Sequence, residues 1–163
     1  MPDDASLPEM ARSLRALGAS RDRATESAHD AIFTPLLEAR VRASRLSGRD
    51  VVGALRGATV AEQIERGVVS AAVEGVEQPA VARARASEAR ELIHTVRDAL
   101  MALDDRATGA RSAGPGTAEW DAWLAALRAV FAAADEACNH LARLLAVPPR
   151  VKERSRWFRS RGS

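Results

Sequence analysis

The chain has 163 residues, of which 47% are hydrophobic and 28% are charged, and its formal net charge is +2. This composition excludes a disordered chain, and the length suits one buried core with an appendage. Tyrosine is absent and few β-branched or aromatic residues alternate with period two, so an all-α fold is predicted. No stretch reaches the roughly 20 apolar residues of a membrane span, and the acidic N-terminus is unlike a signal peptide, so we expect a cytoplasmic protein.

The first part of the chain contains two signals for helix starts. A capping box at Ser6 predicts a first helix, and beyond Gly18 the pattern fits either its continuation or a second helix. Thr34 followed by Pro35 predicts a new start, because proline at the first helical position loses no hydrogen bond. A short helix is therefore expected from Pro35 to about Ser44.

Two further helices are predicted before residue 78. Ser47 begins a second capping pattern ahead of a short apolar run, which ends at Gly57. Thr59, with an acidic residue three positions later, is expected to cap a longer helix that ends at Gly75.

Two long segments with apolar stripes follow. Pro79 predicts a helix that runs to Leu103, and a second helix spans Glu119–Val147. The intervening Asp104–Gly116 is rich in glycine, proline and small residues, which predicts a surface loop and an antiparallel hairpin. The second helix carries an apolar seam in steps of three and four, formed by Trp120, Leu124, Leu127, Phe131, Ala134, Cys138, Leu141 and Leu145.

The predicted architecture is a helical bundle built on this long antiparallel hairpin, with short N-terminal helices packed across it. Residues 1–78 hold the N-terminal helices, residues 79–148 hold the hairpin of the same globular body, and residues 149–163 form a basic tail. The single cysteine lies in the seam, where a small core residue in a reducing compartment is expected.

The tail concentrates the positive charge of the chain. From Pro148 onward it has six basic residues and one acidic residue, so the rest of the chain is mildly acidic. Aromatic residues lie among the basic residues of the tail. This mixture is typical of segments that bind nucleic acid by phosphate neutralisation and base stacking. The candidate contacts are Arg154, Arg156 and Arg159. A frayed terminus, a membrane surface and a protein partner remain alternatives for this segment.

The segment from Pro35 to Val69 resembles the helix-turn-helix of bacterial DNA-binding proteins, with a short helix, a turn at Gly57 and a helix capped by Thr59. The resemblance implies that this last helix enters the major groove of DNA. It departs from the family at Gln63, where a branched apolar residue is usual. The candidate DNA contacts are Arg49, Arg56, Gln63 and Arg66, with Arg40, Arg42 and Arg45 alongside.

Two other interpretations stay open. The same short helices could simply fill one end of the bundle. The protein could also be a helical interaction or assembly protein, in which Trp120, Trp123 and the seam contact a second copy or another protein; the width of the apolar stripe makes a homodimer an option.

An enzyme would need polar groups that converge on one place. His29, His94 and His140 fall on three different predicted helices. Glu136 and His140 share a helix face, but no second carboxylate–histidine pair accompanies them, as di-iron bundles require. No phosphate-binding glycine loop or nucleophile elbow is present. We therefore predict a non-enzymatic binding protein with no catalytic residues, metal or cofactor, and with DNA as its partner.

Overall fold

The structure is a computed structural model that describes the backbone of residues 6–149 and the side chains of residues 22–149. Within this range the chain forms helices and no strand, so the predicted all-α class is confirmed. The tail candidates Arg154, Arg156 and Arg159 lie outside the described residues. The helices are α1 Ser6–Ser44, α2 Asp50–Ala54, α3 Gly57–Val73, α4 Pro79–Leu92, α5 His94–Ala113 and α6 Ala118–Ala146.

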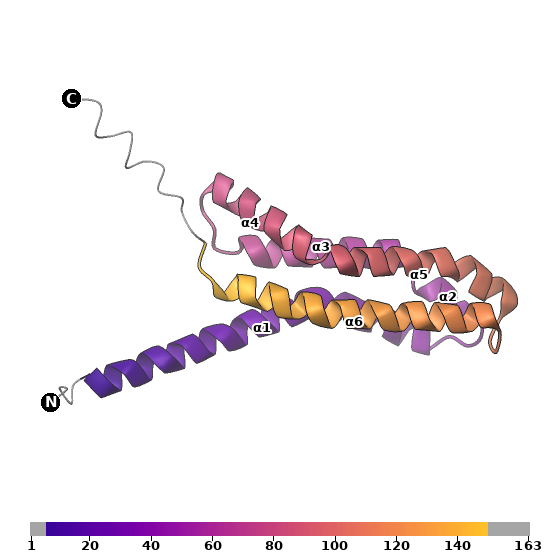
Figure 1. The fold of residues 1–163 in the computed structure, drawn as a ribbon, viewed down its shortest axis with the longest axis horizontal. Helices are drawn as coiled ribbons and strands as arrows, with labels where there is room; N and C mark the ends of the chain where they lie inside the picture. Colours follow the sequence, from indigo (N-terminus) through magenta and orange to yellow (C-terminus); the bar gives the residue numbers. More distant parts are fainter. Residues whose placement is uncertain (1–5, 150–163) are drawn as a thin grey trace, which may run out of the picture.

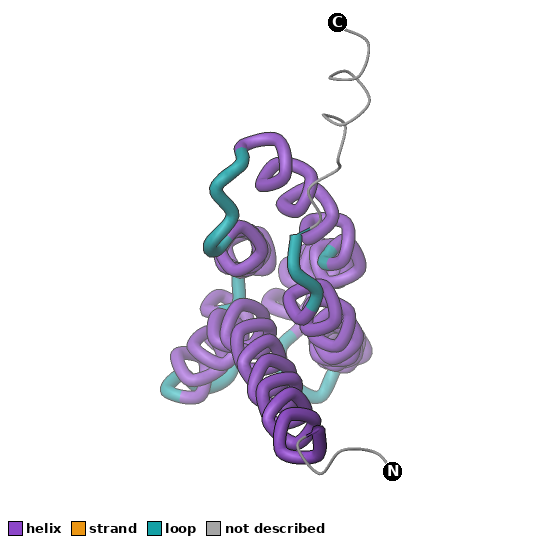
Figure 2. The backbone as a smooth tube through the Cα atoms, turned by 90° about the vertical axis from the view of Figure 1, so that its left-hand side faces the viewer, coloured by secondary structure: helices purple, strands orange, loops and turns teal. Residues whose placement is uncertain are grey.

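The helices form an elongated bundle. α5 packs against α6 more extensively than any other pair, while α3 contacts α1, α4 and α5. Figure 1 shows α5 and α6 running side by side in opposite directions, and the beginning of α1 extending past the other helices. Figure 2, viewed from one end, shows the helices gathered around a shared interior. The N-terminal helices therefore cover one side of the α5–α6 pair.

Pro35 lies inside α1, so the predicted helix start at Thr34 is wrong. A proline within a helix costs about 3 kcal/mol, because it cannot donate to the carbonyl four residues earlier. That carbonyl belongs to Ala31, and α3 packs closely against it: a Cβ on Gly67 would lie 3.3 Å from the Ala31 oxygen. Ile32 and Leu36 are also buried on either side of the proline. Tertiary packing therefore keeps α1 continuous.

The predicted boundaries around α2 and α3 are also wrong. α2 begins at Asp50 and has no side-chain cap, so Ser47 does not start it. α3 begins at Gly57, so this glycine opens a helix where the sequence predicted an end, and Thr59 lies within the first turn. The predicted end at Gly75 is confirmed, because α3 stops at Val73 and Gly75 has a φ of +72°.

The second half follows the predicted order with one large difference. Pro79 starts α4 and α6 spans almost the predicted range. The predicted loop Asp104–Gly116 is wrong over most of its length, because α5 continues to Ala113. Its last turns stay helical because Ala110 is fully buried. The helix predicted to run to Leu103 is also interrupted at Ile93, where α4 ends and α5 begins.

The buried face of α6 includes Ala134, Cys138 and Leu141 of the predicted seam, but nearer the start of the helix it is centred on Trp123 and Val130, which widen the predicted stripe. The fully buried large side chains of α6 are Trp123, Val130 and Leu141, whereas Leu127 and Phe131 are half-buried. Thr117 caps α6 by accepting a hydrogen bond from the Trp120 amide. Because Trp123 is only 1% exposed within its own chain, it offers no surface for the predicted contact with a second copy.

Candidate nucleic-acid interface

A short basic stretch joins the end of α1 to the start of α3. Residues 42–56 contain four arginines and a single acidic residue, Asp50. All four arginines are exposed, and none forms an ion pair with any residue that the structure describes. We call this set the basic edge; its members are Arg42, Arg45, Arg49 and Arg56.

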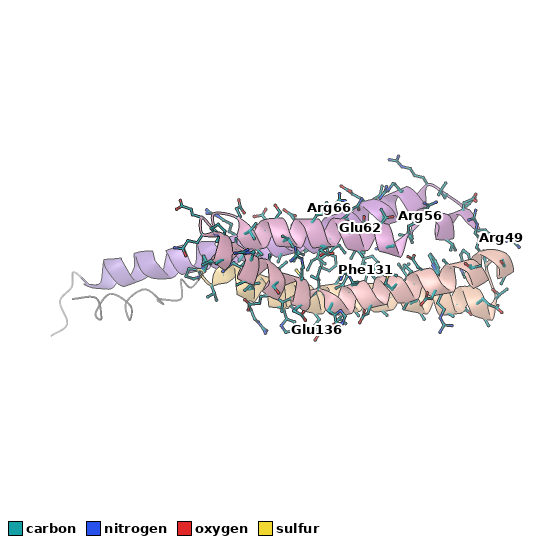
Figure 3. The ribbon with its side chains drawn as sticks, turned by 90° about the horizontal axis from the view of Figure 1, so that it is seen from above. Arg49, Arg56, Glu62, Arg66, Phe131 and Glu136 are labelled. Carbon is teal, nitrogen blue, oxygen red and sulfur yellow. The ribbon has the colours of Figure 1, made fainter. Side chains whose placement is uncertain are left out.

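The backbone fixes where these arginines emerge. Arg42 is in the last turn of α1, while Arg49 and Arg56 directly precede α2 and α3. Arg49 also lies over the turn between α5 and α6, since a Cβ on Gly114 would come within 3.1 Å of its Nε. Figure 3 shows Arg49 near one end of the molecule, with Arg56 next along the same side. The basic edge therefore reaches from the end of the bundle, at Arg49, back along one side to the start of α3.

The start of α3 is capped by a residue from another helix. The carboxylate of Asp104, on α5, accepts hydrogen bonds from the amides of Gly57 at 2.7 Å and Ala58 at 2.9 Å. A carboxylate at this position also interacts favourably with the helix dipole. The predicted Thr59 cap is therefore replaced by Asp104. The first amides of α3 are consequently already occupied and do not face a phosphate group.

Replacing Asp104 with alanine is expected to lower the free energy of unfolding by about 0.5–2 kcal/mol, the usual cost of losing a helix cap. Chemical denaturation followed by circular dichroism measures this change. The matched control is Asp105→Ala, because Asp105 is the exposed neighbour and makes none of the hydrogen bonds that hold α3. Equal losses in the two variants would show that the capping bonds contribute nothing.

The other predicted DNA contacts on α3 lie apart from the basic edge. Gln63 is half-buried, and Arg66 is exposed beside Glu62 at 4.0 Å. Arg66 follows Arg56 by ten residues, which separates them by about 15 Å along a helix. Figure 3 shows Arg66, Arg56 and Arg49 in a row along one side of the molecule, with Arg49 nearest its end, while Gln63 is half-buried. Arg42 and Arg45 are exposed, at the end of α1 and in the connection that follows it.

Glu65, one of two acidic residues near the predicted DNA-facing side of α3, is turned toward neighbouring helices. Its carboxylate pairs with Arg90 of α4 at 3.2 Å and with Arg97 of α5. These contacts tie three helices together. Glu65 thus serves the packing of the bundle, and its charge is balanced by two arginines.

Each of the three histidines contacts a residue of its own helix. His29 stacks on Phe33 with ring centroids 4.8 Å apart, while His94 and His140 each approach an acidic residue on their own helix, at 3.6 and 3.8 Å. Throughout the described part of the chain, no three metal-ligating side chains come together. The pKa of the Cys138 thiol is raised above its ordinary value, mainly because the thiol is buried and also because the negative charge of Asp135 lies nearby. A thiol with a raised pKa is a poor nucleophile.

Comparison with protein-family models, with curated proteins and with solved structures finds no match for this chain in any of the three. In the part of the chain that the structure describes, no helix combines the length and apolar character needed to cross a bilayer.

Proposed function

We propose that this protein is a non-enzymatic binding protein that contacts the phosphate backbone of duplex DNA through the basic edge. The observation that supports this is the group of four exposed arginines without acidic partners among the described residues. Duplex DNA carries one negative charge per about 1.7 Å of its axis. The planar guanidinium group can bind phosphate oxygens with two hydrogen bonds.

Phosphate contacts fix the position of a protein on DNA but carry no direct sequence information. α3 contributes few side chains for reading bases, because Glu62 and Arg66 on its exposed side pair with each other. We therefore expect binding with little sequence preference, with the tail arginines adding to its affinity.

The test compares two variants that lose the same charge. Arg45, Arg49 and Arg56 are replaced together by alanine, and fluorescence anisotropy measures the affinity for a random duplex at low salt. A hydrogen bond to a charged group contributes about 1.5–3 kcal/mol, so we expect the dissociation constant to rise at least about tenfold. The control replaces Arg23, Arg83 and Arg143, which are exposed, unpaired among the described residues and distant in sequence from the basic edge.

Three results would contradict the proposal. The first is that the full chain does not bind DNA, and the second is that both triple variants lose affinity equally. The third is that binding survives the basic-edge changes but disappears when residues 150–163 are deleted, which would move the function to the tail. A loss caused by Gln63→Ala that depends on the DNA sequence would instead restore the groove-reading role of α3.

A further inference from the structure

A cavity of about 380 Å³, partly open to solvent, lies between the helices and is bordered by residues of α1, α3, α5 and α6 and by the connection before α3. This volume is within the range of about 300–1,000 Å³ that small-molecule sites usually have. Figure 3 shows Phe131 of α6 in the region between the helices. The cavity is therefore large enough to hold a small organic molecule.

The walls of the cavity are apolar. Leu36, Leu103, Leu127 and Phe131 line it, and among the described residues its charged lining residues are Arg40 and Arg128. Leu127 and Phe131 are only half-buried by the protein although they pack against the core. An apolar molecule in the cavity would cover this remaining surface, and covering apolar surface contributes about 25 cal/mol per Å².

The two arginines determine which class of molecule fits. Arg40 comes from α1 and Arg128 from α6, both are exposed, and neither forms an ion pair with a described residue. No acidic side chain from the described part of the chain lines the cavity. Two guanidinium groups beside an apolar space favour a carboxylate, which can accept two parallel hydrogen bonds from an arginine. They disfavour a cation by repulsion.

We propose that this cavity is a binding site for an aliphatic monocarboxylic acid, whose chain occupies the apolar space and whose carboxylate lies between Arg40 and Arg128. Arg40 stands two residues before Arg42, but Arg128 belongs to α6 and not to the basic edge, so a change at Arg128 tests this site apart from the proposed DNA contacts. The two proposals can therefore fail independently.

Isothermal titration calorimetry of the full chain with decanoate, kept below its micelle-forming concentration, tests the site. We expect saturable binding at one molecule per chain, and binding at least about tenfold weaker for methyl decanoate, which has the same chain without the charge. Decyltrimethylammonium, with the opposite charge, is expected not to bind at this site.

The protein side of the test uses Arg128→Gln, with Arg83→Gln as a control of equal charge loss on α4. We expect decanoate to bind about tenfold more weakly to Arg128→Gln and as tightly to the Arg83→Gln control as to the original chain. Circular dichroism and DNA affinity are expected to be unchanged in both variants. Absence of saturable binding would overturn the proposal. Equal binding of decanoate and its methyl ester, or equal effects of the two substitutions, would overturn it as well.

Discussion

Gly57→Ala is expected to lower the free energy of unfolding by about 3 kcal/mol, at the upper end of what overpacking usually costs. A Cβ at this position would lie 2.1 Å from the carbonyl oxygen of Leu100 and 2.9 Å from its carbon. These are backbone atoms of α5, so a side-chain rotation cannot relieve the overlap. The helices would have to separate, which would also strain the hydrogen bonds from Gly57 and Ala58 to Asp104.

The matched control for this change is Gly53→Ala. Gly53 is an exposed residue of α2, and a Cβ there would meet nothing within 4 Å. Alanine in a helix is favoured over glycine by about 0.5–1 kcal/mol, so we expect this variant to be slightly more stable than the original chain. Urea denaturation followed by circular dichroism measures both. A similar response of the two variants would contradict the close contact between α3 and α5.

Trp123→Ala is expected to lower the free energy of unfolding by about 3–5 kcal/mol, the usual cost of removing a large buried aromatic side chain. Trp123 is the largest fully buried side chain of the described core, and its ring lies 5.6 Å from that of Trp120. Since the free energy of unfolding of a small domain is only about 5–15 kcal/mol, this single change would remove a large part of it. Thermal and urea unfolding measure the loss.

Trp123→Phe separates the volume of this side chain from its polar atom. The indole Nε1 is buried without a hydrogen-bond partner among the described residues. Phenylalanine removes this unpaired donor, whose burial is unfavourable by about 1–3 kcal/mol. This gain in free energy offsets part of the cost of the smaller side chain. We therefore expect a net cost below about 1.5 kcal/mol. A cost equal to that of Trp123→Ala would show that the indole nitrogen has a partner and that the packing argument fails.

The sequence predicted the helical class and the α6 helix because apolar residues recur there at helical spacing over many turns. It failed where local signals opposed tertiary packing. Pro35 is a strong start signal, yet α1 continues through it because α3 packs closely at Ala31. The small and polar residues after Asp104 are typical of a loop, yet α5 continues because Ala110 is buried.

The candidate site was predictable only in part. Arg49 and Arg56 could be named because they stand beside a predicted turn, and both are exposed on the same side of the molecule. The separation of Gln63 and Arg66 from them depends on where α3 begins, which Asp104 fixes from 46 and 47 residues away. No local pattern identifies such a partner. The cavity likewise gathers residues from distant parts of the chain, and no motif marks it.

The salt dependence of DNA binding tests the central claim most directly. The logarithm of the binding constant for a random duplex is measured against the logarithm of salt concentration, for the full chain and for the variant lacking Arg45, Arg49 and Arg56. Each phosphate contact contributes about −0.9 to the slope, so we expect the variant's slope to be shallower by about 3. An unchanged slope in this variant, or a full chain whose affinity for DNA does not depend on salt, would contradict the account.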